Sequence, residues 1–359
     1  MSFKANIGIK ATAPAPDIDL DPHKIEFGRS FAPLWLTRSY ANGVWQSASL
    51  ERMGSVNLHP AAITLHYGQS VFEGLKVHKW ADGSLNLFRP VENARRLNRS
   101  AERLSMPVME EGFFVEAVRT LVAHQRDWAP GFPGFLYIRP TLIATEPCLG
   151  VRSSHDFLFY ILALPSGGYF PQTGGDSAGA VRVYVTSTVG RAARGGTGHV
   201  KAAANYAVTI KIIADAKEKG CSQVLFFDAC GQRRIEEMGG MNVFFVAGKK
   251  LLTPRTSGTI LPGITRDSII KIAPSLGYEA EERDINFDEL LVQIKEGEVT
   301  EAFACGTAAV IVGIESFLID TGEDIRMTAP RTVTESLYKR LTDIQFGRQP
   351  DPFDWIVKI

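Results

Sequence analysis

A single lysine stands in a stretch of small, uncharged residues. Lys201 lies in GGTGHVKAAANYAV, where small side chains would let the chain pack closely around the amine. Poor solvation lowers the pKa of an amine and frees it to act as a nucleophile or a base. Most lysines are solvated surface groups, so the neighbouring motifs decide whether Lys201 has a covalent role.

Two adjacent acids follow in the next polar segment. Glu236 and Glu237 stand in RRIEEMGGMNVFF, ahead of two glycines and a strand-like run. A carboxylate aimed at a pyridine nitrogen keeps that ring protonated and strengthens it as an electron sink. The alternative interpretation is a solvated turn, which is the usual place for a pair of glutamates.

Two glycine-containing segments could bind an anion. In ILPGITRDS, Gly263 allows close backbone approach, and the amides of Ile264 and Thr265 lie at an expected helix N-terminus, which favours a phosphate. In ACGTAAV, Thr307 offers a hydroxyl, and free amides stand beside small side chains. Either segment alone could be an ordinary turn, whereas both together with a lysine and an acid are less common.

Basic and aromatic residues gather in the first half of the chain. In FRPVENARRLNRSAERL, Arg96, Arg99 and Arg103 share a face at helical spacing. A solvated helix with glutamate partners explains most of these arginines and leaves one that could turn toward a phosphate.

Two more segments combine aromatic with charged side chains. LHYGQSVFEGLKV places Tyr67 and Phe72 near a glycine turn, and LYIRPTLIATEPCLGV places Tyr137 and Arg139 on an otherwise apolar strand. A charge inside an apolar run is costly, so we expect Arg139 to meet a carboxylate.

The pattern of strands and helices around these residues predicts a mixed α/β protein of two lobes, and we expect a ligand in the cleft between the lobes. Apolar positions in EEGFFVEAVRTLVAHQRDW recur at helical spacing, and the N-terminal segment is expected to be a lead-in strand. The glycine-rich stretch after residue 165 is the best linker. We therefore expect a small N-terminal domain over 1–165, an interdomain loop over 166–180 and a large C-terminal domain over 181–359.

Four elements are predicted in the second half. Residues 181–189 alternate as a half-buried strand does, and the runs CSQVLFFDA and MNVFFVAG are expected to pair as neighbours across a polar turn. Thr265 is expected to cap a helix that ends near SLGY.

Composition excludes several classes of protein. The 359 residues carry 39 basic and 39 acidic side chains, which argues against nucleic acid or an anionic membrane as the main partner. The longest apolar run, Phe157–Leu164, is far shorter than the roughly 20 residues that span a bilayer, and no secretory signal is evident. Four scattered cysteines form neither a CxxC pair nor a disulfide framework, so a cytoplasmic location is expected, and no metal is expected.

The segments QSVFEGLKV, LYIRPTLIATEPCLGV, GGTGHVKAAANYA, GCSQVLFFDACGQRRIEEMGGMNVFFV, LPGITRDS and ACGTAAVI, together and in this order, resemble the branched-chain amino acid aminotransferases. The resemblance covers about residues 65–312. It implies a fold type IV pyridoxal 5'-phosphate enzyme with a mixed α+β fold: a smaller N-terminal α/β domain, a larger pseudo-barrel domain, and a homodimer with the cofactor in the cleft.

The resemblance also assigns roles, motif by motif. Lys201 would be the Schiff-base lysine, Tyr206 would hydrogen-bond the phenolic oxygen of the cofactor, and Glu237 would face its pyridine nitrogen. The phosphate would be held by residues of three motifs, with Arg191 close by and Arg99 as a less favoured alternative: Arg96, Ile264, Thr265 and Thr307. The substrate pocket would be lined by Tyr67, Phe72, Tyr137, Arg139, Gly240 and Ala308, with Tyr169 on a mobile interdomain loop.

Two departures from the family pattern are evident. Many members have Thr where this chain has Gly240, so one hydrogen bond to substrate or cofactor is missing or is replaced by a backbone amide or water. Some animal members carry a CxxC redox pair beside the GTA motif, whereas here Cys305 precedes the motif and no cysteine follows it. We therefore expect no thiol switch of that type.

The implied activity is a reversible ping-pong transfer of the amino group from L-leucine, L-isoleucine or L-valine to 2-oxoglutarate. D-Amino acid aminotransferase and 4-amino-4-deoxychorismate lyase share the fold and are the nearest alternatives. EGLK, RPTLIATEP and EEMGGMN favour the branched-chain interpretation. A non-catalytic protein that binds phosphate ligands is the alternative from another class, and the joint presence of Lys201, Tyr206 and Glu237 argues against it.

Overall fold

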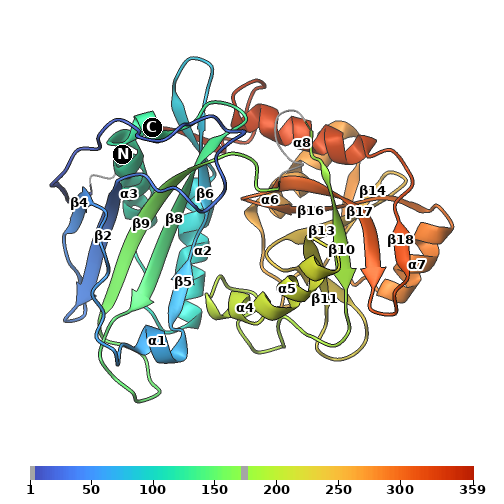
Figure 1. The fold of residues 1–359 in the computed structure, drawn as a ribbon, viewed down its shortest axis with the longest axis horizontal. Coiled ribbons are helices and arrows are strands. Elements are labelled where there is room, and N and C mark those ends of the chain that lie inside the picture. Colours follow the sequence, from blue (N-terminus) through green and yellow to red (C-terminus); the bar gives the residue numbers. More distant parts are fainter. Residues whose placement is uncertain (1–4, 171–176) are drawn as a thin grey trace. The chain divides into compact units, whose positions relative to one another are not determined.

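The computed structural model describes residues 5–170 and 177–359, and contacts within it divide the chain into two compact units (Figure 1). Unit 1 comprises residues 1–169, 201–204 and 345–359, and unit 2 comprises residues 170–200 and 205–344. Part of the expected interdomain loop, residues 171–176, lies outside the described residues. The predicted domain bounds stay a prediction. Unit 1 also includes two segments from outside the predicted N-terminal domain: residues 201–204, which begin at Lys201, and the last 15 residues of the chain.

Unit 1 contains a ten-stranded sheet with the order β1-β4-β2-β9-β8-β6-β7-β19, in which β3 pairs with β2 and β5 pairs with β8. Its strands are β1 (Ile7–Ile9), β2 (Leu34–Ala41), β3 (Val44–Trp45), β4 (Ala48–Arg52), β5 (Ser70–Phe72), β6 (Leu75–Lys79), β7 (Leu85–Phe88), β8 (Phe135–Ala144), β9 (Phe157–Ser166) and β19 (Ile356–Lys358). The expected lead-in strand is confirmed as β1. The longest ladder joins β8 and β9 from Phe135↔Ser166 to Ala144↔Phe157.

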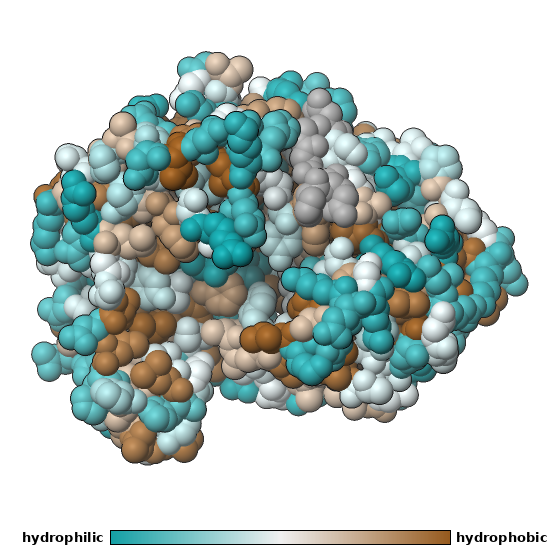
Figure 2. Space-filling view, viewed as in Figure 1, coloured by the Kyte–Doolittle hydropathy of each residue, from teal (hydrophilic) through white to brown (hydrophobic). Residues whose placement is uncertain are grey.

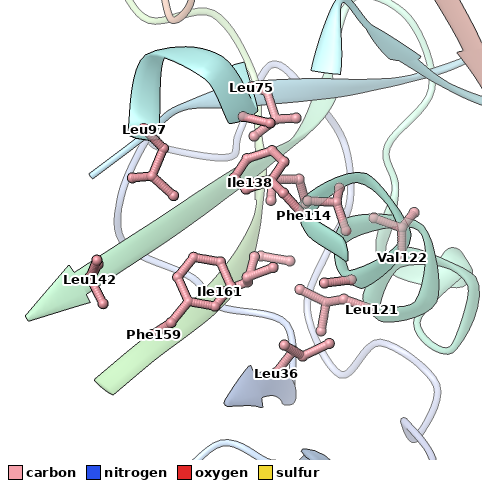
Figure 3. Packing of buried hydrophobic residues seen from close by; sticks show 14 of the residues in the cluster. Leu36, Leu75, Leu97, Phe114, Leu121, Val122, Ile138, Leu142, Phe159 and Ile161 are labelled. Atoms are coloured by element: carbon pink, nitrogen blue, oxygen red, sulfur yellow. The ribbon is translucent and has the colours of Figure 1, made fainter. Parts of the chain in front are cut away.

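Helices cover one face of this sheet. They are α1 (Ile63–Tyr67), α2 (Pro90–Arg103) and α3 (Glu111–Ala123), with a 3₁₀ turn at Arg126–Trp128. The predicted amphipathic helix is confirmed as α3, because its buried residues recur every three or four positions. Figure 3 shows side chains of α2 and α3 packing onto strand residues in the core, including Leu97, Phe114, Ile138 and Phe159. Lys76, Tyr137 and Arg139 lie on the opposite face of the sheet, which does not contribute to this core.

Unit 2 contains a nine-stranded sheet with the order β12-β11-β10-β17-β16-β13-β14-β15, and β18 pairs with β17. Its strands are β10 (Ala180–Val185), β11 (Gln223–Phe227), β12 (Ile235–Met238), β13 (Asn242–Ala247), β14 (Lys250–Pro254), β15 (Glu279–Arg283), β16 (Val299–Gly306), β17 (Val310–Ile319) and β18 (Asp324–Arg326). Strand β12 is the first strand in this order. It nevertheless contacts β13 and β14, which lie near the opposite end of the sheet. The sheet therefore curls into the expected pseudo-barrel.

The helices of unit 2 surround this curled sheet. They are α4 (Ala204–Ala207), α5 (Ile210–Glu218), α6 (Ile264–Ile272), α7 (Phe287–Lys295) and α8 (Thr332–Gln345), and a 3₁₀ turn follows α6 at Ala273–Leu276. One apolar cluster combines strand residues such as Val243 and Phe317 with Phe287 of α7. A separate cluster packs Ile212 and Ala216 of α5 against β10 and β11.

Three local predictions were wrong. The runs that became β11 and β13 are not neighbours: β12 returns antiparallel to β11 (Leu225↔Met238), while β13 pairs with β14 and β16. The strand expected over 181–189 ends at Val185. Thr265 does not cap its helix, because Gly263 has the extended N-cap conformation and Thr265 is already the second helical residue.

Candidate active site

Lys201 is held by backbone contacts within unit 1. Its amide donates to the Ser100 hydroxyl of α2 (2.9 Å), and its carbonyl accepts from the amide of Phe72 (3.2 Å). The next residue, Ala202, forms an isolated bridge with Val71 of β5. These contacts fix the segment 201–204 against β5 and α2, and Lys201 itself is half-buried. The Nζ atom of Lys201 lies 4.9 Å from the centre of the Phe72 ring.

The Phe72 ring also connects Lys201 to Arg139. The Arg139 guanidinium lies 4.7 Å from the same ring centre and donates to the Tyr137 hydroxyl (3.2 Å). Gly74 is required here, because a side-chain Cβ at that position would overlap the Tyr137 hydroxyl. The structure thus brings together Phe72, Tyr137, Arg139 and Lys201, four of the predicted site residues.

A buried ion pair lies beside Lys201. Glu73, which is fully buried, accepts from Arg96 Nε (2.6 Å) and Nη2 (2.9 Å) and from the Asn93 amide (2.7 Å). Burial alone would raise the pKa of Glu73, but the charge and hydrogen bonds of Arg96, with the Lys201 charge, hold it below its ordinary value. Arg96 is therefore a buried helix residue with a fixed orientation, whereas Arg99 is exposed.

Two predicted aromatic residues of unit 1 lie near its surface. Tyr67, at the end of α1, is exposed and donates its hydroxyl to the carbonyl of Leu149. Tyr169 is exposed as well, and its ring packs edge-on against Phe27, which in turn packs against Tyr137. Tyr169 is thus linked to Tyr137 through one intervening ring.

In unit 2, Glu237 is the centre of a buried polar cluster. Its carboxylate forms an ion pair with Arg191 and accepts from the Leu261 amide (3.1 Å) and the Asn242 side-chain amide (3.4 Å). Arg191 also donates to the carbonyls of Gly198 (3.0 Å) and Thr259. An arginine and two amides therefore hold this carboxylate in place, where it can accept from a proton-bearing ring nitrogen.

The solvated-turn interpretation of the two acids was wrong. Glu236 and Glu237 are both buried, on strand β12. Successive side chains of a strand point to opposite faces, so only one of two adjacent acids can face a given ligand. Glu236 accepts from the Thr259 hydroxyl, and burial raises the pKa of its carboxyl group.

The expected anion-binding turn of α6 has the required backbone. The helix begins at Ile264 after an extended Gly263, which has no side chain to act as a cap. Asn242 approaches Gly263 so closely that a Cβ there would overlap its Oδ1 atom. Thr265 is buried and the helix is nine residues long, so its first amides can receive a phosphate group.

The remaining predicted residues of unit 2 lie in the turns that follow β12 and β16. Gly306 ends β16 and precedes Thr307 and Ala308, both half-buried. Asn242 of β13, which binds Glu237, is directly opposite Cys305 of β16. The GTA motif begins at the next residue, so it lies close to the Glu237 cluster. A Cβ atom added to Gly240 would lie 3.5 Å from the Tyr206 ring, which is an ordinary van der Waals distance. The structure therefore has room for the Cβ atom of the threonine that many family members have at this position.

The donor set fits pyridoxal 5'-phosphate. Unit 1 offers an amine, and unit 2 offers a buried carboxylate paired with an arginine for the pyridinium nitrogen, a tyrosine hydroxyl, and the first amides of α6 with a threonine hydroxyl for the phosphate. These groups are Lys201 in unit 1 and Glu237, Tyr206, Thr265 and Thr307 in unit 2.

The sequence analysis missed three residues that hold the site. Glu73 fixes Arg96, Ser100 binds the Lys201 amide, and Asn242 binds Glu237. Glu73 and Asn242 are single polar residues in the apolar runs SVFEGL and GGMNVFF, a pattern that indicates buried hydrogen bonding. Nothing in the local sequence distinguishes Ser100 from a surface serine.

A lysine anchored in unit 1, and a buried acid and a helix N-terminus on the pseudo-barrel of unit 2, are the parts that a class of pyridoxal-phosphate enzyme needs. The family described as amino-transferase class IV matches residues 70–317, and the chain belongs to that family. Enzymes of this class use pyridoxal 5'-phosphate.

Three relatives within this class are branched-chain amino acid aminotransferases. A branched-chain-amino-acid aminotransferase of Mycobacterium tuberculosis is 42% identical, with 98% of this chain and 97% of the relative covered. The enzyme of that name from Mycolicibacterium smegmatis is 45% identical over 88% of this chain and 86% of its own. A solved branched-chain amino acid aminotransferase from Thermobaculum terrenum, in its pyridoxal-phosphate form, gives a TM-score of 0.73 at 25% identity and covers 92% of this chain and 99% of its own.

Proposed function

We propose that this protein is a branched-chain L-amino acid transaminase. It transfers the amino group of L-leucine, L-isoleucine or L-valine reversibly to 2-oxoglutarate, giving branched 2-oxo acids and L-glutamate. The observation that carries the proposal is the buried Glu237 carboxylate, held by Arg191 and the Leu261 amide, in a chain whose relatives bear that name.

Lys201 is the residue that holds the cofactor and moves the proton. When bound, pyridoxal phosphate supplies an electron sink for the negative charge that develops at the substrate Cα atom. The Nζ atom of Lys201 takes the Cα proton, so one amine serves as base and then as acid. Anchorage of both its amide and its carbonyl limits the movement of this amine to its own side chain.

Glu237 sets the strength of that sink. An ionised carboxylate next to the pyridine nitrogen favours the protonated ring, which withdraws more electron density. Arg191 forms an ion pair with Glu237 and holds the carboxylate in place, while Tyr206 would donate to the phenolic oxygen. Ile264, Thr265, Thr307 and Arg96 would hold the phosphate.

The substrate pocket must accept an apolar side chain and a carboxylate in turn. Phe72 supplies an apolar ring, and Arg139 with Tyr137 supplies cationic and hydroxyl donors on the same sheet face. Tyr67, Tyr169, Gly240 and the Ala308 amide complete the proposed lining.

We also propose that the enzyme is a cytoplasmic homodimer. Apolar side chains with large exposed fractions gather at α1 and the loop between β8 and β9, which Tyr67 contacts: Leu65 (60%), Tyr67 (43%), Leu149 (62%) and Val151 (85%). Figure 2 shows brown atoms concentrated at the end of unit 1 where Figure 1 places α1. Exposed apolar patches of this kind favour association with another protein surface, and a second copy is the occupant we propose. Among the described residues, no helix is long and apolar enough to cross a membrane.

The test of the activity is the visible spectrum of the purified protein with L-leucine and, in parallel, with D-alanine. We expect a yellow cofactor band that L-leucine alone converts toward the pyridoxamine spectrum, and we expect Lys201→Ala to abolish the conversion. A response to D-alanine only would assign the protein to the D-specific branch. A protein that stays colourless with added pyridoxal phosphate would contradict the proposal.

A further inference from the structure

Unit 2 contains a second pocket, which none of the proposed cofactor or substrate residues line. Its empty volume is about 540 Å³, which includes space that is open to solvent. Its wall is formed by the start of β12, by the ends of β14 and β15, and by the turns that follow β11, β14 and β15. It includes Asp228, Glu236, Arg255, Thr259 and Arg283.

Positive charge exceeds negative charge in this pocket. Four arginines line it, against three acids. Arg234 pairs with Asp284 (3.4 Å), whereas Arg194 and Arg255 have exposed side chains that make no hydrogen bond or ion pair within the described part of the chain. Two guanidinium groups are therefore available to a ligand.

A buried acceptor completes the pocket. Glu236 is 5% exposed, and its Oε1 atom accepts from the Thr259 hydroxyl. Its Oε2 atom is buried and has no hydrogen-bond partner among the described residues. A buried carboxylate oxygen without a donor is costly, so a ligand that brings a donor would relieve this cost.

We propose that this pocket is a regulatory site for a small anion that also carries a hydrogen-bond donor. The guanidinium groups of Arg194 and Arg255 bind the anionic oxygens, and Oε2 of Glu236 accepts from the donor. Monohydrogen phosphate and 2-hydroxy acids share this chemistry, so they are the two sources to distinguish.

Thr259 links the pocket to the cofactor acid. Its hydroxyl donates to Glu236, and its carbonyl accepts from Arg191, which pairs with Glu237. Glu236 and Glu237 are also consecutive residues of β12. A ligand that moves the Glu236 carboxylate therefore acts on the Arg191–Glu237 pair through one intervening residue.

Calorimetric titration of the holoenzyme tests binding, with inorganic phosphate in one arm and L-lactate in the other. The cofactor already occupies its own phosphate site, so phosphate reports on the second pocket. We expect at least one arm to bind, with affinity reduced about 10-fold or more in Arg255→Gln because a charge-assisted hydrogen bond is lost. Arg326→Gln, whose side chain is 72% exposed and does not line the pocket, is the matched control and should bind as the wild type does.

Binding by phosphate alone assigns the site to phosphate compounds, and binding by lactate alone assigns it to hydroxy acids. Absence of binding in both arms, or equal affinity in Arg255→Gln and the wild type, would overturn the site. The link to Glu237 is tested by the pH midpoint of the visible cofactor band, which we expect the bound anion to shift in the wild type and not in Arg255→Gln. Binding without such a shift would overturn the regulatory role.

Discussion

Arg139 is the only cationic residue besides Lys201 in the proposed pocket lining, and its surroundings suit the two substrates that we propose. Its guanidinium lies on the Phe72 ring and donates to the Tyr137 hydroxyl, so it stays on an apolar surface while remaining able to bind an anion. The sequence suggested that Arg139 would meet a carboxylate. The side chain of glutamate or 2-oxoglutarate would supply one.

We expect Arg139→Met to impair glutamate far more than leucine. Loss of a charge-assisted contact should raise the KM for glutamate and 2-oxoglutarate about 10-fold or more, while leucine half-reactions change by less than about 3-fold. Single-turnover kinetics of each half-reaction provide the measurement, and Arg52→Met, an exposed arginine of β4, is the control. Equal losses for both substrates would defeat the assignment.

At the scale of elements, buried carboxylates join strands to helices in both units. Glu73, between β5 and β6, fixes Arg96 of α2. In unit 2, Glu301 of β16 is 3% exposed and accepts from the amides of Val333 (2.9 Å) and Thr334 (2.8 Å) and from the Thr334 hydroxyl (2.7 Å). A strand carboxylate thus takes the place of a local cap at the start of α8.

We expect Glu301→Gln to loosen the first turn of α8. An amide has one oxygen, so at least one of the three donors loses its acceptor, at a cost of about 1–3 kcal/mol. Hydrogen exchange of the amides at 333–336 should become faster, while exchange in β8 stays unchanged. Glu323→Gln, which removes only a half-exposed partner of Lys295, is the control and should leave α8 unchanged. Unaltered exchange in Glu301→Gln would show that the carboxylate does not cap the helix.

At the scale of the whole molecule, one buried histidine affects how stability depends on pH. His78 is 1% exposed, both of its ring nitrogens lack partners among the described residues, and its ring packs on Phe346 at 4.7 Å. Burial, with the neighbouring Lys76 charge, lowers the pKa of His78 to about 3. As pH falls below about 6.5 the unfolded chain binds a proton that the folded protein does not, so the free energy of unfolding falls down to about pH 3.

We expect His78→Phe to reduce the fall in the free energy of unfolding at acid pH. The variant has no group to protonate, so between about pH 6.5 and pH 3.5 it should lose less stability than the wild type, by up to about 4 kcal/mol. Urea unfolding of unit 1 across that pH range provides the measurement. His124→Phe, at an exposed position, should follow the wild type. Parallel curves for His78→Phe and the wild type would contradict the predicted origin of the loss.

The proposed homodimer is also a property of the whole molecule. We expect Leu149→Glu to shift the mass in solution toward the monomer, because a charge would be buried in the apolar patch around α1. Light scattering after size-exclusion chromatography measures the mass. Val44→Glu, which changes an equally exposed side chain on β3 outside the patch, should leave the mass unchanged. A wild-type protein that is monomeric at every concentration would contradict the dimer.

The sequence by itself determined the family, the cofactor and the pattern of helices such as α3, because motif order and apolar periodicity are local properties. It also restricted the acid for the pyridine nitrogen to Glu236 or Glu237, and the resemblance favoured Glu237. Which side of β12 each acid faces depends on strand pairing between distant residues, and so does the burial that ruled out a solvated turn.

Only the tertiary structure decided the rest. Contacts of Lys201 with Phe72 and Ser100 join segments about 100 residues or more apart, and no local pattern specifies such pairs. For the same reason, the placement of β12 beside β11, the Glu73–Arg96 pair and the pocket beneath Glu236 could not be read from motifs. Local propensity selects the elements, whereas burial and long-range hydrogen bonding select which of them meet.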